Sequence, residues 1–378
     1  MKPRSDRPVV RACLALAALV TLAQCGDPGP AAPGPVDASF VLADAGRTLR
    51  DATSAVSLLN TAIRRFLSDP DEETRASAVD ALYLAHDAWL EAWAGAAVLS
   101  GESMSAHAYS IDAWPVTPGF LDTLPEYPQS GMVADVTLPL NASSVRRQHG
   151  FSDDSEVAMG FHAIWHLLTD RTVDDFIGSD ELTTRRRLLL GLQAELLFAD
   201  LHTIGNASRR ETVTLLALMS ASIDTLEQAL ALAHAAERGT PHLSRTGPAA
   251  ASRRIAQPIT IWLSHEAVRR RLAVAHPALR DRLAETLRVL NATDTPEISV
   301  SDVGANNDSP PDANRPVGRV DDAGAADPVG YSPVGPPDAG TETDATDPEQ
   351  SRLALALRAS IQVLNDVVRA ERALSGVP

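Results

Sequence analysis

Gly160-Phe161-His162-Ala163-Ile164-Trp165-His166 is an apolar stretch that carries two histidines four residues apart. On a helix this spacing places both imidazoles on one face, with their β-carbons about 5–6 Å apart. Two neutral imidazoles at that separation can bind one transition metal, as they do in helical zinc sites. The stretch therefore predicts a helix with a metal site at His162 and His166. The alternative is a pair of core histidines bonded to backbone or carboxylate groups.

Helical periodicity continues on both sides of this stretch. Asp153 and Glu156 have capping-box spacing, so the motif helix is expected to run from Asp153 to about Asp170. Apolar residues at three- and four-residue spacing predict the other helices over residues 40–67, 72–99, 179–202, 208–237, 249–275, 277–291 and 350–374. No alternating strand pattern is visible, so the predicted fold class is all-α.

The first 25 residues predict the location of the protein. A basic beginning is followed by an apolar run over 12–23 that is too short for a permanent membrane anchor. Leu22-Ala23-Gln24-Cys25 resembles a bacterial lipobox, so residues 1–24 are interpreted as a lipoprotein signal peptide and Cys25 as the lipidated residue. Gly26 after the cysteine favours the outer membrane, with the protein in the cell envelope facing the periplasm or the cell surface. The alternative is an ordinary secretory signal with an incidental cysteine.

Two further segments differ from the helical part in composition. Residues 101–150 are rich in proline, glycine and serine, and long loops of this kind are often functional or cover a cleft. Residues 292–349 are acidic, rich in Pro, Gly and Asp and almost free of aromatics, which predicts a disordered insertion. The expected organisation is a signal peptide over 1–24, a Pro/Gly-rich tether over 25–37, a helical domain over 38–291, the insertion over 292–349 and a C-terminal helix over 350–378 that completes the domain.

Charge and cysteine usage exclude some classes of partner and stabilisation. The formal net charge is −16, and removal of the basic signal segment would make it more negative. Nucleic acid is therefore not an expected partner, because basic patches provide that affinity. The chain has two cysteines; Cys13 would leave with the signal and Cys25 would carry lipid, so no disulfide is expected in the mature domain.

Several segments together resemble the imelysin-like family of exported all-α proteins. Gly160 and His162 match the first part of its Gly-x-His-x-x-Glu motif. The other matching segments are Ala88-Trp89-Leu90-Glu91, Asp112-Ala113-Trp114-Pro115 and Arg185 to Leu201. The resemblance covers about residues 40–290 plus the last helix. It implies paired up-and-down helical bundles, with the motif helix lining the cleft between them. Members of the family are described as metallopeptidases or as periplasmic metal-binding components of iron uptake.

The sequence also departs from the family pattern. The motif glutamate falls on Trp165, and the arginines around the second-helix tryptophan fall on His86 and Trp93. The Phe-Ser-Asp-Asn-like segment of the second half is missing from 238–262. His166 could replace the lost glutamate, although one position along a helix turns a ligand by about 100°.

The expected cofactor is a divalent transition metal, zinc or iron. His162 and His166 are the first candidate ligands. Further candidates, by rough family position, are Glu91, Glu102, Asp87 and His86. Oxygen ligands suit iron and manganese, whereas a nitrogen-rich set favours zinc, copper or nickel.

The loss of the glutamate bears on activity. The two histidines have the spacing of a zincin, but Trp165 cannot serve as the general base of peptide hydrolysis. We therefore expect a cell-envelope lipoprotein that binds a metal or small ligand, with a metal-uptake system as its partner and without robust catalysis. The alternatives are a metallopeptidase of the family and a structural or partner-binding envelope protein that has lost the site.

Overall fold

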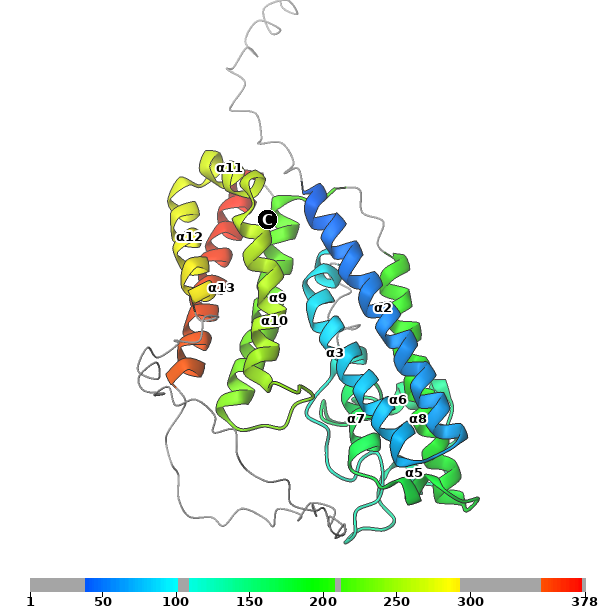
Figure 1. The fold of residues 1–378 in the computed structure, drawn as a ribbon. Coiled ribbons are helices and arrows are strands. Elements are labelled where there is room, and N and C mark those ends of the chain that lie inside the picture. Colours follow the sequence, from blue (N-terminus) through cyan, green and yellow to red (C-terminus); the bar gives the residue numbers. More distant parts are fainter. Residues whose placement is uncertain (1–37, 101–108, 208–211, 293–347, 376–378) are drawn as a thin grey trace, which may run out of the picture.

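The computed structural model describes residues 38–100, 109–207, 212–292 and 348–375 (Figure 1). Within these residues every regular element is helical, and an isolated bridge pairs Leu124 with Tyr127. The prediction of an all-α fold is therefore confirmed. The signal segment, the tether, Cys25, Glu102 and nearly all of the predicted insertion lie outside the described residues.

The N-terminal half forms the first group of helices in Figure 1. Helix α2 (Ser39–Ser68) pairs with α3 (Glu72–Ser100), and α8 (Glu181–Ala207) packs along α2. The first two approach closely at Gly95, where an added Cβ would lie 2.8 Å from the Ala45 Cα. Short helices close the lower end of this bundle: α5 (Gly131–Ala134), α6 (Ala142–Gln148), α7 (Phe161–Thr169) and the 3-10 helix η2 (Val173–Phe176).

The C-terminal half forms a second bundle beside the first (Figure 1). Its helices are α9 (Leu215–Glu237), α10 (Pro248–Ser264), α11 (Glu266–Ala275), α12 (Pro277–Ala292) and α13 (Pro348–Ser375). Helix α13 packs against α9 and α12, so the last helix completes this bundle. Helices α8 and α9 are long and apolar enough to cross a membrane, but half of each apolar stretch is buried against other helices, as in the core of a helical bundle.

Helix α3 forms the junction, because α9 and α10 both pack against it. Several polar contacts cross between the bundles. The Trp262 indole nitrogen donates to Asp44 Oδ2 at 2.9 Å, and Arg254 Nη1 lies 2.5 Å from Asp87 Oδ1. The junction therefore combines apolar packing with specific polar ties.

Three predicted boundaries were wrong. The motif helix begins at Phe161 and not at Asp153, because Gly160 has a φ of +92°, outside the helical region. The Glu156 carboxylate instead accepts hydrogen bonds from Ser152 in an irregular turn. The helix expected from 208 begins at Leu215, with Thr214 as its N-cap. The helix expected over 249–275 is two helices, divided at the N-cap His265.

Candidate metal centre

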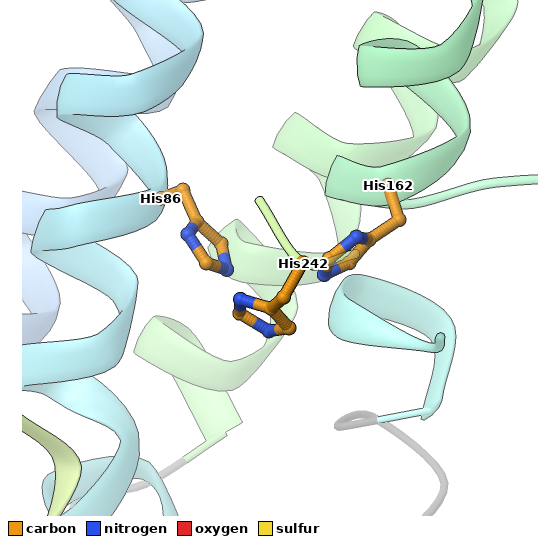
Figure 2. Close-up of side chains that lie close together, drawn as sticks. All are labelled: His86, His162 and His242. Carbon is orange, nitrogen blue, oxygen red and sulfur yellow. The ribbon is translucent and has the colours of Figure 1, made fainter. Parts of the chain in front are cut away.

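Three histidines from separate parts of the sequence meet where the two bundles join. His86 lies on α3, His162 in the first turn of α7, and His242 on the loop between α9 and α10 (Figure 2). One potential ligand atom from each lies within 4.8 Å of the others. The residues are 0%, 2% and 7% exposed, respectively. We call these residues together with Asp112 the histidine centre.

Asp112 links two of the imidazoles. His86 Nε2 donates a hydrogen bond to Asp112 Oδ1 at 3.1 Å, and His162 Nε2 lies 3.4 Å from the same oxygen. Burial alone would raise the pKa of Asp112, but the neighbouring His86 and His162 imidazoles lower it below the usual value for a carboxyl. The centre therefore contains one ionised carboxylate among three imidazoles.

Gly160 allows α7 to approach this carboxylate. A Cβ at Gly160 would lie 2.5 Å from the carbonyl oxygen of Ile111, the residue before Asp112. The glycine also adopts a positive φ immediately before the helix, a conformation that a side chain disfavours. The motif glycine thus brings the start of α7, with His162, against the segment that carries Asp112.

Several buried nitrogen and oxygen atoms of the centre have no hydrogen-bond partner. Among the described residues, no hydrogen-bond partner is found for His86 Nδ1, Asp112 Oδ2, His162 Nε2 or either ring nitrogen of His242. A buried polar atom without a partner costs about 1–3 kcal/mol. A neutral imidazole has one N–H and one lone pair, so a metal ion bound here would satisfy one nitrogen of each ring and a carboxylate oxygen.

Burial also keeps two of the imidazoles in the metal-binding form. Desolvation lowers the pKa of His162, and it lowers the pKa of His242 to about 2. Neutral imidazole, not imidazolium, is the form that binds metals. These two side chains are therefore ready to act as ligands at neutral pH.

The spacing of the atoms fits a small transition metal. In a tetrahedral zinc site with bonds of about 2.0–2.1 Å, neighbouring ligand atoms are about 3.4 Å apart. The contacts from Asp112 Oδ1 to His86 Nε2 and His162 Nε2, 3.1 and 3.4 Å, are already at that separation. The three histidine ligand atoms lie within 4.8 Å of one another, so they would draw closer by up to about 1.4 Å around a metal, and the donor set of three nitrogens and one oxygen suits it.

The structure separates the residues that the sequence proposed as ligands. His162 lies in the centre, together with His86. His166 lies one helical turn further on, where its Nδ1 is 2.6 Å from Asp170 Oδ2 and its side chain is 30% exposed. Glu91 is exposed on α3 and is not part of the histidine centre. Glu102 lies outside the described residues.

The structural residues of the predicted motifs surround the centre. Trp114 packs edge-on against His242, with ring centroids 5.2 Å apart, and is followed by Pro115 across a cis peptide bond. Trp89 is fully buried on α3, one turn after His86. Trp165, at the position of the family glutamate, has its ring centroid 6.2 Å from that of His162.

Sequence reasoning missed two members of the centre, Asp112 and His242. Asp112 was recognised only as part of a fold signature, although an acid between Ile111 and Ala113 in an apolar context is itself a signal of a buried polar site. His242 lies in a ten-residue connection and has no spacing relation to the other histidines. No local pattern could have found it, because only the packing of the second bundle on α3 brings it there.

Two helical bundles with a buried histidine–aspartate centre at their junction define the class of this protein: an all-α protein with a candidate metal site. The family model for imelysin matches residues 45–293, and the chain belongs to the imelysin family. No curated protein matches the chain. Among solved structures, an iron-regulated protein A precursor from Parabacteroides distasonis is similar, with 11% identity and a TM-score of 0.46, over 93% of this chain and 98% of the other.

Proposed function

We propose that this protein binds one transition-metal ion at the histidine centre and has no robust catalytic activity. The observation that supports this most strongly is the convergence of unpartnered, buried ligand atoms from three elements. A purely structural cluster would be expected to use its lone pairs in hydrogen bonds, as buried polar groups generally do.

The donor set favours zinc. Three imidazoles and one carboxylate form a nitrogen-rich site. Such a site suits zinc, copper or nickel, whereas manganese prefers oxygen ligands. Among these metals, zinc has no geometric preference of its own, so it makes the least demand on how these four side chains are arranged. Iron is the alternative, because imidazole also suits iron.

The geometry favours binding over hydrolysis. Catalytic zinc sites have three protein ligands and an open position for water, whereas closed sites have four. His86, Asp112, His162 and His242 would supply four, and all are buried. Trp165, at the family glutamate position, has an indole that cannot accept a proton.

One observation favours a metallopeptidase as the second candidate. Asp112 is a carboxylate in direct contact with two of the histidines, which is where a general base would lie if it remained outside the coordination sphere. Three histidines would then hold the metal and leave its fourth position open. Asp112→Asn separates the two functions, because it would abolish hydrolysis in a peptidase and weaken metal binding in a closed site.

The proposed location rests on the N-terminal sequence. The basic and apolar segment over 1–24 and the lipobox-like Cys25 support a lipid-anchored protein of the bacterial cell envelope, in the outer membrane. A buried metal site in that compartment would serve capture or delivery within a metal-uptake system. Radiolabelled palmitate incorporation, lost in Cys25→Ser, tests the anchor.

Metal titration of the purified protein tests the proposed function. After removal of metal by a chelator, we expect one equivalent of zinc to bind per chain. Cobalt at the same site should give the intense visible bands of a tetrahedral complex. Removing a ligand should weaken binding beyond the 10–100-fold typical of an outer-shell residue, so His162→Ala and His242→Ala should both lower affinity more than about hundredfold.

His166→Ala is the matched control for these variants. It removes a histidine from the same helix as His162, but one that pairs with Asp170 at the surface. Zinc affinity should therefore stay unchanged. Equal losses in His162→Ala and His166→Ala, or no stoichiometric metal in the unaltered protein, would contradict the site. Iron binding in preference to zinc would retain the site and change its metal.

A further inference from the structure

The two bundles contribute different numbers of residues to the histidine centre. His86, Asp112 and His162 belong to the N-terminal half, whereas His242 comes from the connection between α9 and α10 in the second bundle. We propose that residues 238–247 form a movable loop that closes the centre, and that Arg245 is the positioning residue that holds this loop against α3. This proposal rests on the proposed function and adds the route by which metal enters and leaves.

The loop has a glycine near each end. Gly239 has a φ of +63° and Gly247 a φ of +84°, and an added Cβ at either position would meet nothing within 4 Å. Neither glycine is therefore required by close packing. Each supplies a left-handed backbone conformation beside a helix terminus, and such positions can change direction at low energetic cost.

His242 is held by ring packing, and its side chain has no polar attachment among the described residues. Neither of its ring nitrogens has a hydrogen-bond partner in the part of the chain that the structure describes. Its ring packs on His162, with centroids 4.7 Å apart, and on Trp114. The adjacent Leu243 is fully buried and supplies the apolar part of the contact. A metal would add the missing polar interaction.

Arg245 supplies a polar tie between the loop and α3. Its guanidinium pairs with Asp80 and lies over the ring of Tyr83, with 4.9 Å from the Arg245 Cζ to the ring centroid. Asp80 and Tyr83 are on α3, within two turns before His86. Arg245 therefore attaches the loop to the same helix that carries one of the ligands, three residues after the loop's own ligand.

The contacts of Arg245 with Asp80 and Tyr83 are weak enough for the loop to open and close reversibly. The Arg245 and Asp80 side chains are 50% and 67% exposed, so their ion pair is screened by water. The contact with Tyr83 adds a cation–π interaction of the kind found at exposed sites. When Arg245 releases, His242 can move with its loop and leave His86, Asp112 and His162 as an open half-site.

Two arms test the proposal. In the first, the metal-free protein is labelled with diethylpyrocarbonate and modification of each histidine is followed by mass spectrometry. His242 should be protected relative to the exposed His265. Arg245→Ala should raise the modification rate of His242 about tenfold, as expected for loss of an exposed ion pair and a cation–π contact.

In the second arm, zinc is loaded and its transfer to an excess of chelator is timed. Arg245→Ala should release zinc about tenfold faster with unchanged stoichiometry.

Arg254→Ala is the matched control. Arg254 also pairs with an aspartate of α3, Asp87, but it lies within helix α10 and not on the loop. Labelling of His242 and zinc release should both remain at the level of the unaltered protein. Arg245→Lys keeps the charge but loses the planar contact with Tyr83, so it should give intermediate rates.

The two arms separate the two proposals. If the unaltered protein takes up no zinc, the proposed function fails, while the labelling arm still tests the loop. If zinc binds but Arg245→Ala leaves labelling or release unchanged, the role of Arg245 is overturned and the function stands. Equal acceleration of labelling and zinc release by Arg254→Ala would also overturn the role of Arg245. Loss of any ion pair between the bundles would then have the same result.

Discussion

Two buried clusters in this protein combine histidine with a carboxylate, and they are built differently. In the histidine centre, three imidazoles lie together and two of them, His86 and His162, contact Asp112. In the second cluster, His276 Nε2 lies 2.8 Å from Glu371 Oε1, and Arg271 Nη2 donates to Glu371 Oε2 at 3.1 Å. The second cluster contains a permanent cation, the Arg271 guanidinium, whereas the histidine centre contains none.

The unpartnered atoms of the two clusters also differ in kind. In the second cluster they are the Nε and Nη1 groups of Arg271, which are hydrogen-bond donors and cannot bind a cation. In the histidine centre they include carboxylate oxygen and imidazole nitrogen, which offer lone pairs. Burial and histidine content are therefore shared by both clusters, and only the type of unsatisfied atom marks one of them as a metal site.

Loss of Glu371 should have the largest effect on stability. Glu371→Ala leaves Arg271 as a nearly buried charge without its carboxylate, which should lower the free energy of unfolding by about 3–5 kcal/mol. Urea unfolding followed by circular dichroism measures this. Glu266→Ala is the control, because its pair with Arg270 is exposed on α11 and should contribute less than about 1 kcal/mol. Equal losses of unfolding free energy in the two variants would show that the second cluster is not a structural ion pair. Zinc affinity should be unchanged in both variants.

Zinc should stabilise the protein through the histidine centre alone. At a free concentration of 100 times the Kd, zinc should raise the free energy of unfolding by about 2.7 kcal/mol. Thermal unfolding with and without zinc measures the shift. In His242→Ala the shift should nearly disappear, whereas in Glu371→Ala it should remain. A shift that survives in His242→Ala would place the metal elsewhere.

Gly160→Ala tests how closely the first turn of α7 approaches Asp112. The new Cβ would meet the Ile111 carbonyl and require a disfavoured positive φ, so we expect a loss of about 1–3 kcal/mol and weaker zinc binding together. Gly178→Ala is the control, because Gly178 also has a positive φ but an added Cβ would have only an ordinary 3.4 Å contact with Asp180. That variant should lose stability without losing zinc affinity.

The sequence predicted the helical fold and the bundles more completely than it predicted the site. Periodicity located the long helices, because each buries an apolar face over many turns. It placed the start of the motif helix too early, because the acidic residues at 153 and 156 satisfy a turn and Gly160 interrupts the helix.

The site was predicted only in part for a different reason. Helical spacing put His162 and His166 on one face, but only His162 reaches the centre, whereas His166 pairs with Asp170 near the end of α7. Asp112 and His242 reach the centre through tertiary packing, which no local pattern encodes. The family resemblance pointed to His86, because it occupies the position of a family arginine.

The pH dependence of stability tests whether the imidazoles of the histidine centre are buried and neutral, and its effect on the free energy of unfolding is the smallest predicted. Burial depresses the pKa of His162, and of His242 to about 2, below the value of about 6.5 in an unfolded chain. Above pH 6.5 both residues are neutral in both states, so their contribution to stability is fully present. As the pH falls below 6.5, the unfolded chain binds protons that the folded chain excludes, and metal-free protein loses stability. For His242 the slope approaches about 1.4 kcal/mol per pH unit, and His162 adds to it in the same direction.

Urea unfolding of metal-free protein at pH 7, 6 and 5 measures this slope. His242→Ala should reduce it by about 1.4 kcal/mol per pH unit at the acidic end, because one of the two groups is gone. Saturating zinc should move the loss of stability of the unaltered protein to lower pH, since protons must then displace the metal from the imidazoles. An equal slope in His242→Ala and in the unaltered protein would mean that His242 is not held neutral in the folded centre, and the case for it as a ligand would weaken accordingly.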